Sequence, residues 1–255
     1  HKSRKFTFDG SSSGSRDISQ IKNADELDNC LQQFLETISS TDYVLREIYE
    51  YTTVLPETYY GQSSYAKWIR VGWALKNTSN KLLIVWIAFS AKSSTFDYNS
   101  ISDMCEQWDN FSRKETGVTN RSIIYWAKQD NPSGSEGIRK NAIGYYLDMT
   151  INAVTANAIA NPSKNAKGST DYDIAVVLHQ MYKDTYVCAD VRNGTWFYYA
   201  DHLWRQLDSG TYLRKAISNE LRELYEGRAG ELQNYLFALE NDTDEEKVKN
   251  TKARL

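Results

Sequence analysis

The chain has 255 residues, of which 41% are hydrophobic, and its formal net charge is −3. This composition supports a packed core and excludes a disordered chain. The charge excludes a protein that is basic throughout, as many nucleic-acid binders are. No apolar run approaches the roughly 20 residues that a membrane-spanning helix needs, so we expect no membrane partner. With only 3 Pro and 13 Gly, helices are favoured over an all-β design.

The three cysteines, Cys30, Cys105 and Cys188, are odd in number and far apart. A zinc site would need clustered ligands such as Cys-x-x-Cys, which the chain lacks. Separate thiols suit a reducing, intracellular compartment. The polar start of the chain carries no apolar secretory signal, which agrees with that expectation.

Apolar residues recur at steps of three and four along the first half of the chain, which predicts a bundle of short helices. A serine-rich stretch at 9–16 comes first and indicates a flexible linker or the remnant of an engineered fusion. The helices are expected at 27–38, 43–55, 65–77, 81–91, 100–111 and 121–128. The segment 81–91 is apolar on all sides and would also suit a buried strand. Its helical neighbours favour a helix.

The second half begins with a break at 132–136, where turn-forming residues predict a hinge. A long helix is expected at 138–160, followed by a second linker at 161–169. Asp171 or Asp173 is expected to cap the next helix, which runs through Tyr182.

A β-hairpin at 185–199 is predicted by Asn193-Gly194, which separates two runs of aromatic and β-branched residues. A third short strand at 203–207 is compatible with the pattern. A long helix then opens at Ser209-Gly210-Thr211 and runs to about Glu240, with a break at Gly227 or Gly230. A capping-box pattern at 243–246 starts a charged terminal helix, 244–255, which looks truncated.

The predicted fold class is mainly α. A helical bundle is followed by a small α+β module that contains the hairpin and a long C-terminal helix. We divide the chain into a flexible segment at 1–22, a helical domain at 23–131, a hinge helix with a linker at 132–168, and the α+β domain at 169–255.

No complete active site is found, and no catalytic or metal-binding residue is expected. The glycine-rich phosphate loop and the nucleophile elbow are both absent. Asp171 and Asp173 were weighed as a two-metal site for nucleotidyl transfer or nuclease chemistry. On a helix, residues i and i+2 point about 200° apart and do not converge. Helix capping is therefore the preferred interpretation, and the metal-dependent enzyme stays as an alternative.

Charge is distributed unevenly. The stretch from Thr58 to Phe96 has no Asp or Glu, whereas 220–246 is strongly acidic. Basic side chains contact phosphates, so this stretch is a candidate nucleic-acid interface. Its candidate binding residues are Lys67, Arg70, Lys76, Lys81 and Lys92. The simpler interpretation is that the lysines only form a solvent-exposed face and bind nothing. Trp68, Trp73 and Trp86 lie on apolar stripes and are expected to fill the core rather than to stack on bases.

Several short motifs occur in a recognisable order. Trp68-Ile-Arg-Val-Gly72-Trp-Ala-Leu75 precedes Phe89-Ser-Ala-Lys92, Cys105-Glu-Gln-Trp108 and Ile123-Ile-Tyr-Trp-Ala-Lys128. This series resembles the second type of primase C-terminal domain over about 23–131. Farther on, the motifs resemble the pre-helicase domain of poxvirus-type primase–helicases, with Phe197 where that family has Tyr. These later motifs are Asp173-Ile-Ala175, Tyr186-Val-Cys188, Asn193-Gly-Thr-Trp196-Phe-Tyr198 and Leu203-Trp204.

The resemblance implies a position in DNA replication. A primase domain would lie upstream and a superfamily 3 hexameric ATPase downstream, and both would need ATP and Mg²⁺. No cofactor is expected in this part, to which the family contributes no catalytic residue. The chain would then be a connector and collar that guides single-stranded DNA and joins a homo-hexamer, in the host cytoplasm if the source is a large DNA virus. A protein-binding adaptor is a further alternative. The candidate subunit contacts are Arg192, Trp196, Tyr198 and Arg222.

Overall fold

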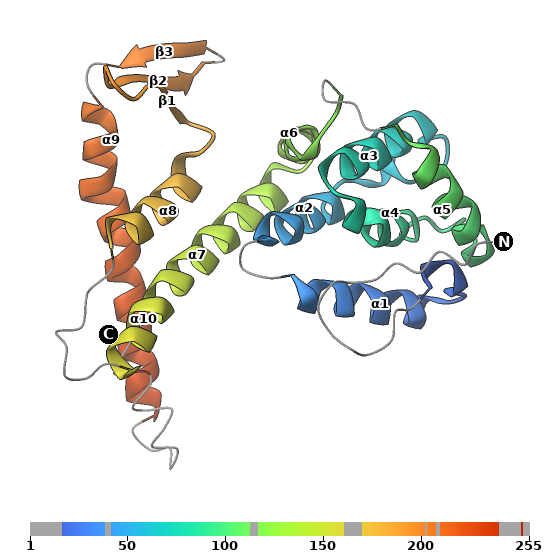
Figure 1. The fold of residues 1–255 in the computed structure, drawn as a ribbon, viewed down its shortest axis with the longest axis horizontal. Helices are drawn as coiled ribbons and strands as arrows, with labels where there is room; N and C mark the ends of the chain where they lie inside the picture. The colour runs from blue at the N-terminus through green and yellow to red at the C-terminus, as the bar shows by residue number, and fades with distance from the viewer. Residues whose placement is uncertain are drawn as a thin grey trace. The chain divides into compact units, whose positions relative to one another are not determined.

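The computed structural model describes residues 17–38, 42–112, 117–160, 170–201, 203–207 and 210–239, together with Thr251. The chain forms two compact units, residues 1–139 and 140–255. Figure 1 draws the first in blue to green and the second in yellow to red. The predicted linkers at 9–16 and 161–169 and the predicted terminal capping box lie outside the described residues. None of the described helices is long and apolar enough to cross a membrane.

The first unit is the predicted bundle of short helices (Figure 1). The segment that was ambiguous from sequence is helix α4, which contacts four other helices of the unit and is buried along almost its whole length. Burial on all sides explains why its sequence shows no helical periodicity. The helices are α1 (Ala24–Thr37), α2 (Tyr43–Thr53), α3 (Tyr65–Thr78), α4 (Leu83–Ser90), α5 (Ile101–Asn110) and α6 (Asn120–Asp130). Short 3₁₀ turns are η1 (Ile18–Gln20), η3 (Glu57–Tyr59), η4 (Asn80–Leu82) and η5 (Tyr98–Ser100).

The core of the first unit is built around Trp86. Its indole stacks on Trp68, with ring centroids 4.8 Å apart, and contacts Trp108 at 5.7 Å. Trp68 Nε1 donates to Ser90 Oγ at 2.7 Å, and Ser90 Oγ donates to the Trp86 carbonyl at 2.8 Å. Trp86 and Trp108 are fully buried and Trp68 is partly buried, as the sequence predicted. Trp73 differs, because 44% of its surface is exposed.

The turn-rich break predicted at 132–136 is wrong, because these residues form the first turns of helix α7 (Pro132–Ala160). Proline is favourable at the first helical position, where its missing N–H would have no partner inside the helix. Asn131 caps this turn, since its Oδ1 accepts from the Gly134 amide at 3.0 Å. Its Nδ2 donates to the Val54 carbonyl at 3.0 Å, just past the end of α2.

The second unit begins with the rest of α7 and continues with helix α8 (Asp171–Tyr182). The N-cap of α8 is Thr170 and not an aspartate, which corrects the sequence prediction. The Asp173 amide donates to Thr170 Oγ at 3.2 Å, and the Asp173 carboxylate accepts from the Thr170 amide at 2.9 Å. This reciprocal pair is a capping box, in which two amides that lack helical partners are satisfied.

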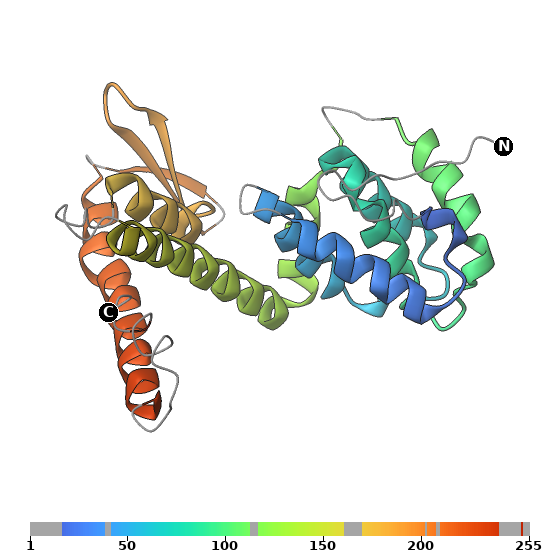
Figure 2. The same cartoon turned by 60° about the horizontal axis from the view of Figure 1, so that its bottom comes forward.

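The predicted hairpin is present as β1 (Tyr186–Asp190) and β2 (Thr195–Ala200), and β3 (Leu203–Leu207) adds a third antiparallel strand. Figure 2 shows the hairpin from a second direction. Gly194 ends the connecting loop at φ +62°, in the left-handed region that glycine adopts most readily. The Asp190 carboxylate holds the loop by accepting from the amides of Arg192 and Asn193 at 2.9 and 3.1 Å.

The long C-terminal helix is also present, as α9 (Thr211–Ala216) and α10 (Arg222–Leu239) joined by one wide π turn (Ile217–Leu221). The predicted break at Gly227 or Gly230 is wrong, because both glycines lie inside α10. Arg228 on α10 forms a bidentate pair with Asp148 on α7 at 2.8 and 2.9 Å. This pair joins the two helices within the second unit.

A candidate nucleic-acid interface on helix α3

Two of the five predicted binding residues, Lys67 and Arg70, lie together on one side of α3. Lys67 Nζ is 4.5 Å from the centre of the Tyr59 ring, and the Arg70 guanidinium is 5.1 Å from the centre of the Trp126 ring. The two rings are neighbours, with centroids 6.1 Å apart. We call this set of four residues, Tyr59, Lys67, Arg70 and Trp126, the basic flank. Both cations are exposed, so the basic flank presents two positive charges that lie over two aromatic rings.

The tyrosine of the basic flank is held in place by an acid. Tyr59 Oη donates to Asp130 Oδ2 at 2.7 Å. Burial and this hydrogen bond both raise the pKa of Tyr59 above its ordinary value, so the phenol is neutral and adds no negative charge. Sequence reasoning missed Tyr59 and Trp126, because they lie far from the lysines along the chain. Trp126 does occur in one of the quoted motifs, which was the available signal.

Lys76 lies on the opposite side of the same helix. It follows Lys67 by nine residues, and about 100° per residue brings it halfway round the helix. Its ammonium is 5.2 Å from the centre of the Trp108 ring. The three cations of α3 therefore do not form one continuous strip.

The last two predicted residues have local structural partners. Lys81, on η4, pairs with Asp42 at 3.4 Å. Lys92 donates to the Thr53 carbonyl at 2.6 Å and lies 5.0 Å from the centre of the Tyr60 ring. A cation is favourable there, because Thr53 ends α2 and carries the negative end of the helix dipole. Burial lowers the pKa of Lys92.

The predicted subunit contacts in the second unit occupy different surfaces. Trp196 and Tyr198 point toward the helices. A Cβ built on Gly210, which precedes α9, would lie 3.7 Å from the nearest atoms of the Trp196 ring. The centroid of the Tyr198 ring is 5.1 Å from that of the Tyr186 ring. Tyr186 in turn packs against Tyr182 of α8 at 5.4 Å.

The other two predicted contacts are charged and exposed. Arg192 lies in the hairpin loop, and Arg222 starts α10, where it pairs with Glu226 at 3.7 Å. Arg192 and Arg222 are exposed, whereas the two aromatic residues of the prediction are partly buried.

The opposite side of the sheet is aromatic and exposed. Cross-strand partners share a face, so Val187 and Phe197 lie together, as do Tyr199 and Trp204. Val187, Tyr199 and Trp204 are 44%, 39% and 50% exposed. We call these four residues the outer sheet face. The predicted contacts Trp196 and Tyr198 lie on the other face of β2, because successive residues of a strand point to opposite faces.

The two aspartates weighed as a metal site both lie in the first turn of α8. A two-metal site would need the two carboxylates on adjacent strands that face one cleft. The structure instead places both at the start of a helix. The hydrogen bonds from the Thr170 amide and hydroxyl lower the pKa of Asp173, as expected for a capping carboxylate. Within the described part of the chain, no three His, Cys, Asp or Glu residues are grouped as metal ligands. This arrangement gives the metal-dependent enzyme no structural support.

Comparison with known proteins agrees with the resemblance seen in the motifs. Residues 50–127, which include α3 to α5 and most of α6, match the family primase C terminal 2 (PriCT-2). The match contains Trp68, Gly72, Trp86 and Trp108, the residues that build the aromatic core.

Two viral relatives carry names that assign them to the helicases. The chain is 30% identical over 191 residues to L207/L206 of Acanthamoeba polyphaga mimivirus, and 27% identical over 157 residues to 022R of Frog virus 3 (isolate Goorha). These alignments cover 73% and 60% of this chain but only 17% and 14% of the relatives. Residues 50–127 are thus similar to a primase C-terminal family, and a larger part of the chain is similar to a short part of two viral proteins that are named as helicases. The chain spans about a sixth of the length of the relatives that it matches.

Proposed function

We propose that this chain connects a primase to a hexameric superfamily 3 ATPase in a replication protein of a large DNA virus, inside the host cell. The first unit contacts single-stranded DNA, and the second unit forms a collar between subunits. ATP, Mg²⁺ and catalysis belong to the neighbouring domains of the longer protein. The match to a primase C-terminal family and the similarity to viral helicases support this position between two activities.

The single observation that carries the DNA contact is the basic flank. Two exposed cations three residues apart on one helix face can neutralise neighbouring phosphates of a strand. Because Lys67 and Arg70 cover the Tyr59 and Trp126 rings, a base has no free ring face there on which to stack. The proposed contact is therefore with the phosphate backbone and independent of base sequence.

The test is the salt dependence of binding to a fluorescent oligothymidylate, measured by anisotropy. Affinity should fall as salt rises, because each neutralised phosphate releases counterions. Lys67→Gln with Arg70→Gln removes both charges and keeps most of each side-chain stem over its ring. This double variant should bind several-fold more weakly and lose about 1.4 from the slope of log K against log salt, at about 0.7 for each single-strand phosphate.

Lys81→Gln is the matched control, because it removes an exposed lysine that is paired with Asp42 away from the basic flank. It should leave both the affinity and the slope unchanged. Equal losses for the control and the double variant would show that only overall charge matters. An unaltered slope in the double variant would exclude the basic flank as the DNA contact.

The proposed collar rests on the outer sheet face. Exposed aromatic and β-branched side chains without a charge among them are the composition found at the centre of protein interfaces. We propose that this face takes the subunit-contact role that the sequence alone assigned to Trp196 and Tyr198.

A further inference from the structure

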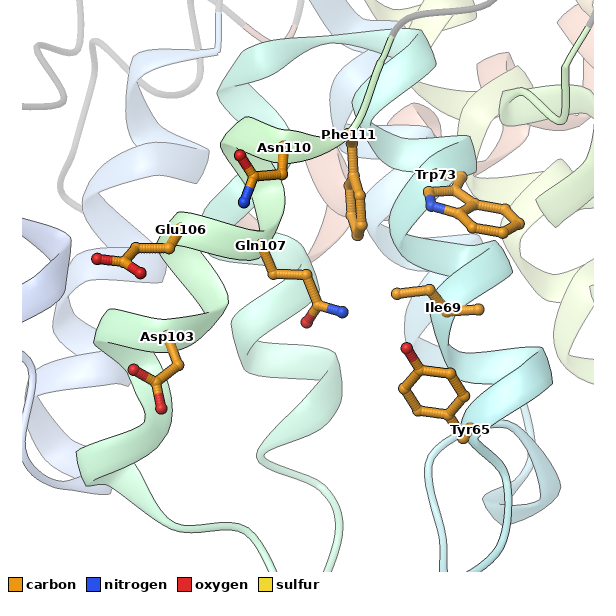
Figure 3. Close-up of a pocket in the computed structure, with 8 residues that line it drawn as sticks. All are labelled: Tyr65, Ile69, Trp73, Asp103, Glu106, Gln107, Asn110 and Phe111. Atoms are coloured by element: carbon orange, nitrogen blue, oxygen red, sulfur yellow. The ribbon is translucent and has the colours of Figure 1, made fainter.

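A pocket with a volume of about 480 Å³ lies between α3 and α5, away from the basic flank. Figure 3 shows its two walls, with one helix contributing rings and the other contributing polar side chains. The lining residues are Tyr65, Ile69, Trp73, Asp103, Glu106, Gln107, Asn110 and Phe111. No role in the proposed function uses this pocket.

The first wall is a stripe of α3 with one residue at every fourth position. Tyr65, Ile69 and Trp73 stand above one another on this face, because four residues make slightly more than one turn. Tyr65 is 65% exposed and Trp73 is 44% exposed, which is unusual for large rings on a packed helix. Phe111 meets Trp73 edge-on, at 6.4 Å and 80°, and so fixes the orientation of the indole.

The second wall is the exposed side of α5 and is acidic. Asp103 and Glu106 are three residues apart on α5, and both line the pocket. Neither carboxylate forms an ion pair with the described residues, and none of the eight lining side chains is cationic. Gln107 and Asn110 add amide groups to the same wall. The residues that line the pocket thus combine two exposed carboxylates with exposed rings.

This combination selects the chemistry of the ligand. A phosphate would be repelled by two carboxylates. A guanidinium would be attracted, because its plane stacks on Trp or Tyr while its N–H groups pair with carboxylate oxygens. A lysine ammonium would also be attracted, but as a point charge it would gain less from the flat aromatic wall.

We propose that the α3–α5 pocket is a docking site for an arginine side chain presented by a segment of a partner protein. The guanidinium lies against Trp73, and its N–H groups pair with the acidic wall of α5. The apolar stem of the arginine covers Ile69. This site does not depend on DNA binding by the basic flank, because the two surfaces share no residue and have opposite charge.

The test uses the 255-residue chain and the peptide acetyl-Gly-Arg-Gly-amide as the probe. Binding is followed by NMR through the indole N–H signal of Trp73, which the Trp73→Phe variant identifies. The signal should shift progressively on titration with this peptide. The same peptide with citrulline, a neutral analogue of the same shape, should cause no comparable shift, because the carboxylates then have no charge to pair with.

The double variant Asp103→Asn with Glu106→Gln should bind the arginine peptide at least about fivefold more weakly. Its fold should stay intact, because both side chains are exposed. Asp28→Asn, an exposed carboxylate on α1, is the matched control and should have no effect. Equal shifts with arginine and citrulline would overturn the proposal, as would unchanged affinity in the double variant. A Trp73 shift caused by oligothymidylate and not by the arginine peptide would instead make the pocket a nucleobase site.

Discussion

At the scale of single residues, Gly72 shows how a motif residue can be required by packing alone. A Cβ built at this position would lie 2.8 Å from Trp86 Cε2 and 3.0 Å from Phe111 Cε2. Trp86 is fully buried and Phe111 packs against it, with ring centroids 5.3 Å apart, so the Trp86 ring cannot move aside freely. Gly72 therefore permits the close approach of α3 to the Trp86 indole.

We predict that Gly72→Ala destabilises the first unit. Alanine favours a helix by about 1 kcal/mol over glycine, but overpacking a core costs about 1–3 kcal/mol. The net loss should be about 1 kcal/mol in urea unfolding followed by tryptophan fluorescence. Gly137→Ala is the matched control, because nothing lies within 4 Å of its added Cβ in α7. The control should be neutral or stabilising, and equal stability of both variants would contradict the packing argument.

Contacts of single residues also explain most of the motifs that carry the family resemblance. Trp68, Gly72 and Ser90 all contact Trp86, through a stacked ring, a close backbone approach and a hydrogen bond to its carbonyl. Lys92 stabilises the end of α2. These motif residues account for the fold of the unit, and the exposed residues around them account for its proposed contacts.

At the scale of secondary-structure elements, the start of α8 is set by a capping box. Thr170→Ala removes the acceptor for the Asp173 amide and should cost about 1 kcal/mol. Ser64→Ala is the matched control, because Ser64 occupies the N-cap of α3 without a side-chain capping bond. Thermal unfolding followed by circular dichroism compares the two. A cost for Ser64→Ala as large as that for Thr170→Ala would argue against the capping bond.

The pH dependence of Asp173 provides a second readout of the same capping box. The hydrogen bonds from Thr170 lower the pKa of this carboxyl in the folded state, so its contribution is fully present above the unfolded pKa. The contribution is lost as pH falls through the lower folded value. Asp173→Asn should therefore be less stable than the wild type at pH 7, and the difference should shrink in strong acid. A constant difference at every pH would exclude the charge of Asp173 as its cause.

At the scale of the whole molecule, the outer sheet face should drive self-association. Trp204→Ser with Val187→Ser removes two exposed apolar side chains from this face and should lower the apparent mass of the chain at high concentration. Sedimentation velocity across a concentration series measures the effect. Tyr172→Ser, which removes an exposed ring from α8, is the control and should associate like the wild type. A wild-type chain that stays monomeric throughout the series would contradict the proposed collar contact.

Much of the fold was predictable because its signals are local. Apolar residues at steps of three and four located the helices, and Asn193-Gly194 located the hairpin. The errors were at positions where a local signal has two meanings. Pro132 was interpreted as a break although proline also starts helices, and the glycines of α10 were tolerated without ending it.

The sequence by itself determined the helical class, the hairpin and the resemblance to a primase C-terminal domain, because periodicity, turn residues and motif order are properties of neighbouring residues. The basic flank and the α3–α5 pocket required the tertiary structure. Tyr59 and Trp126 come together only when η3 and α6 pack around α3, and Asp103 and Trp73 line one pocket only when α5 packs beside α3. Charge along the chain indicated that this region is basic. Packing divided it into one side suited to phosphates and another suited to a cation.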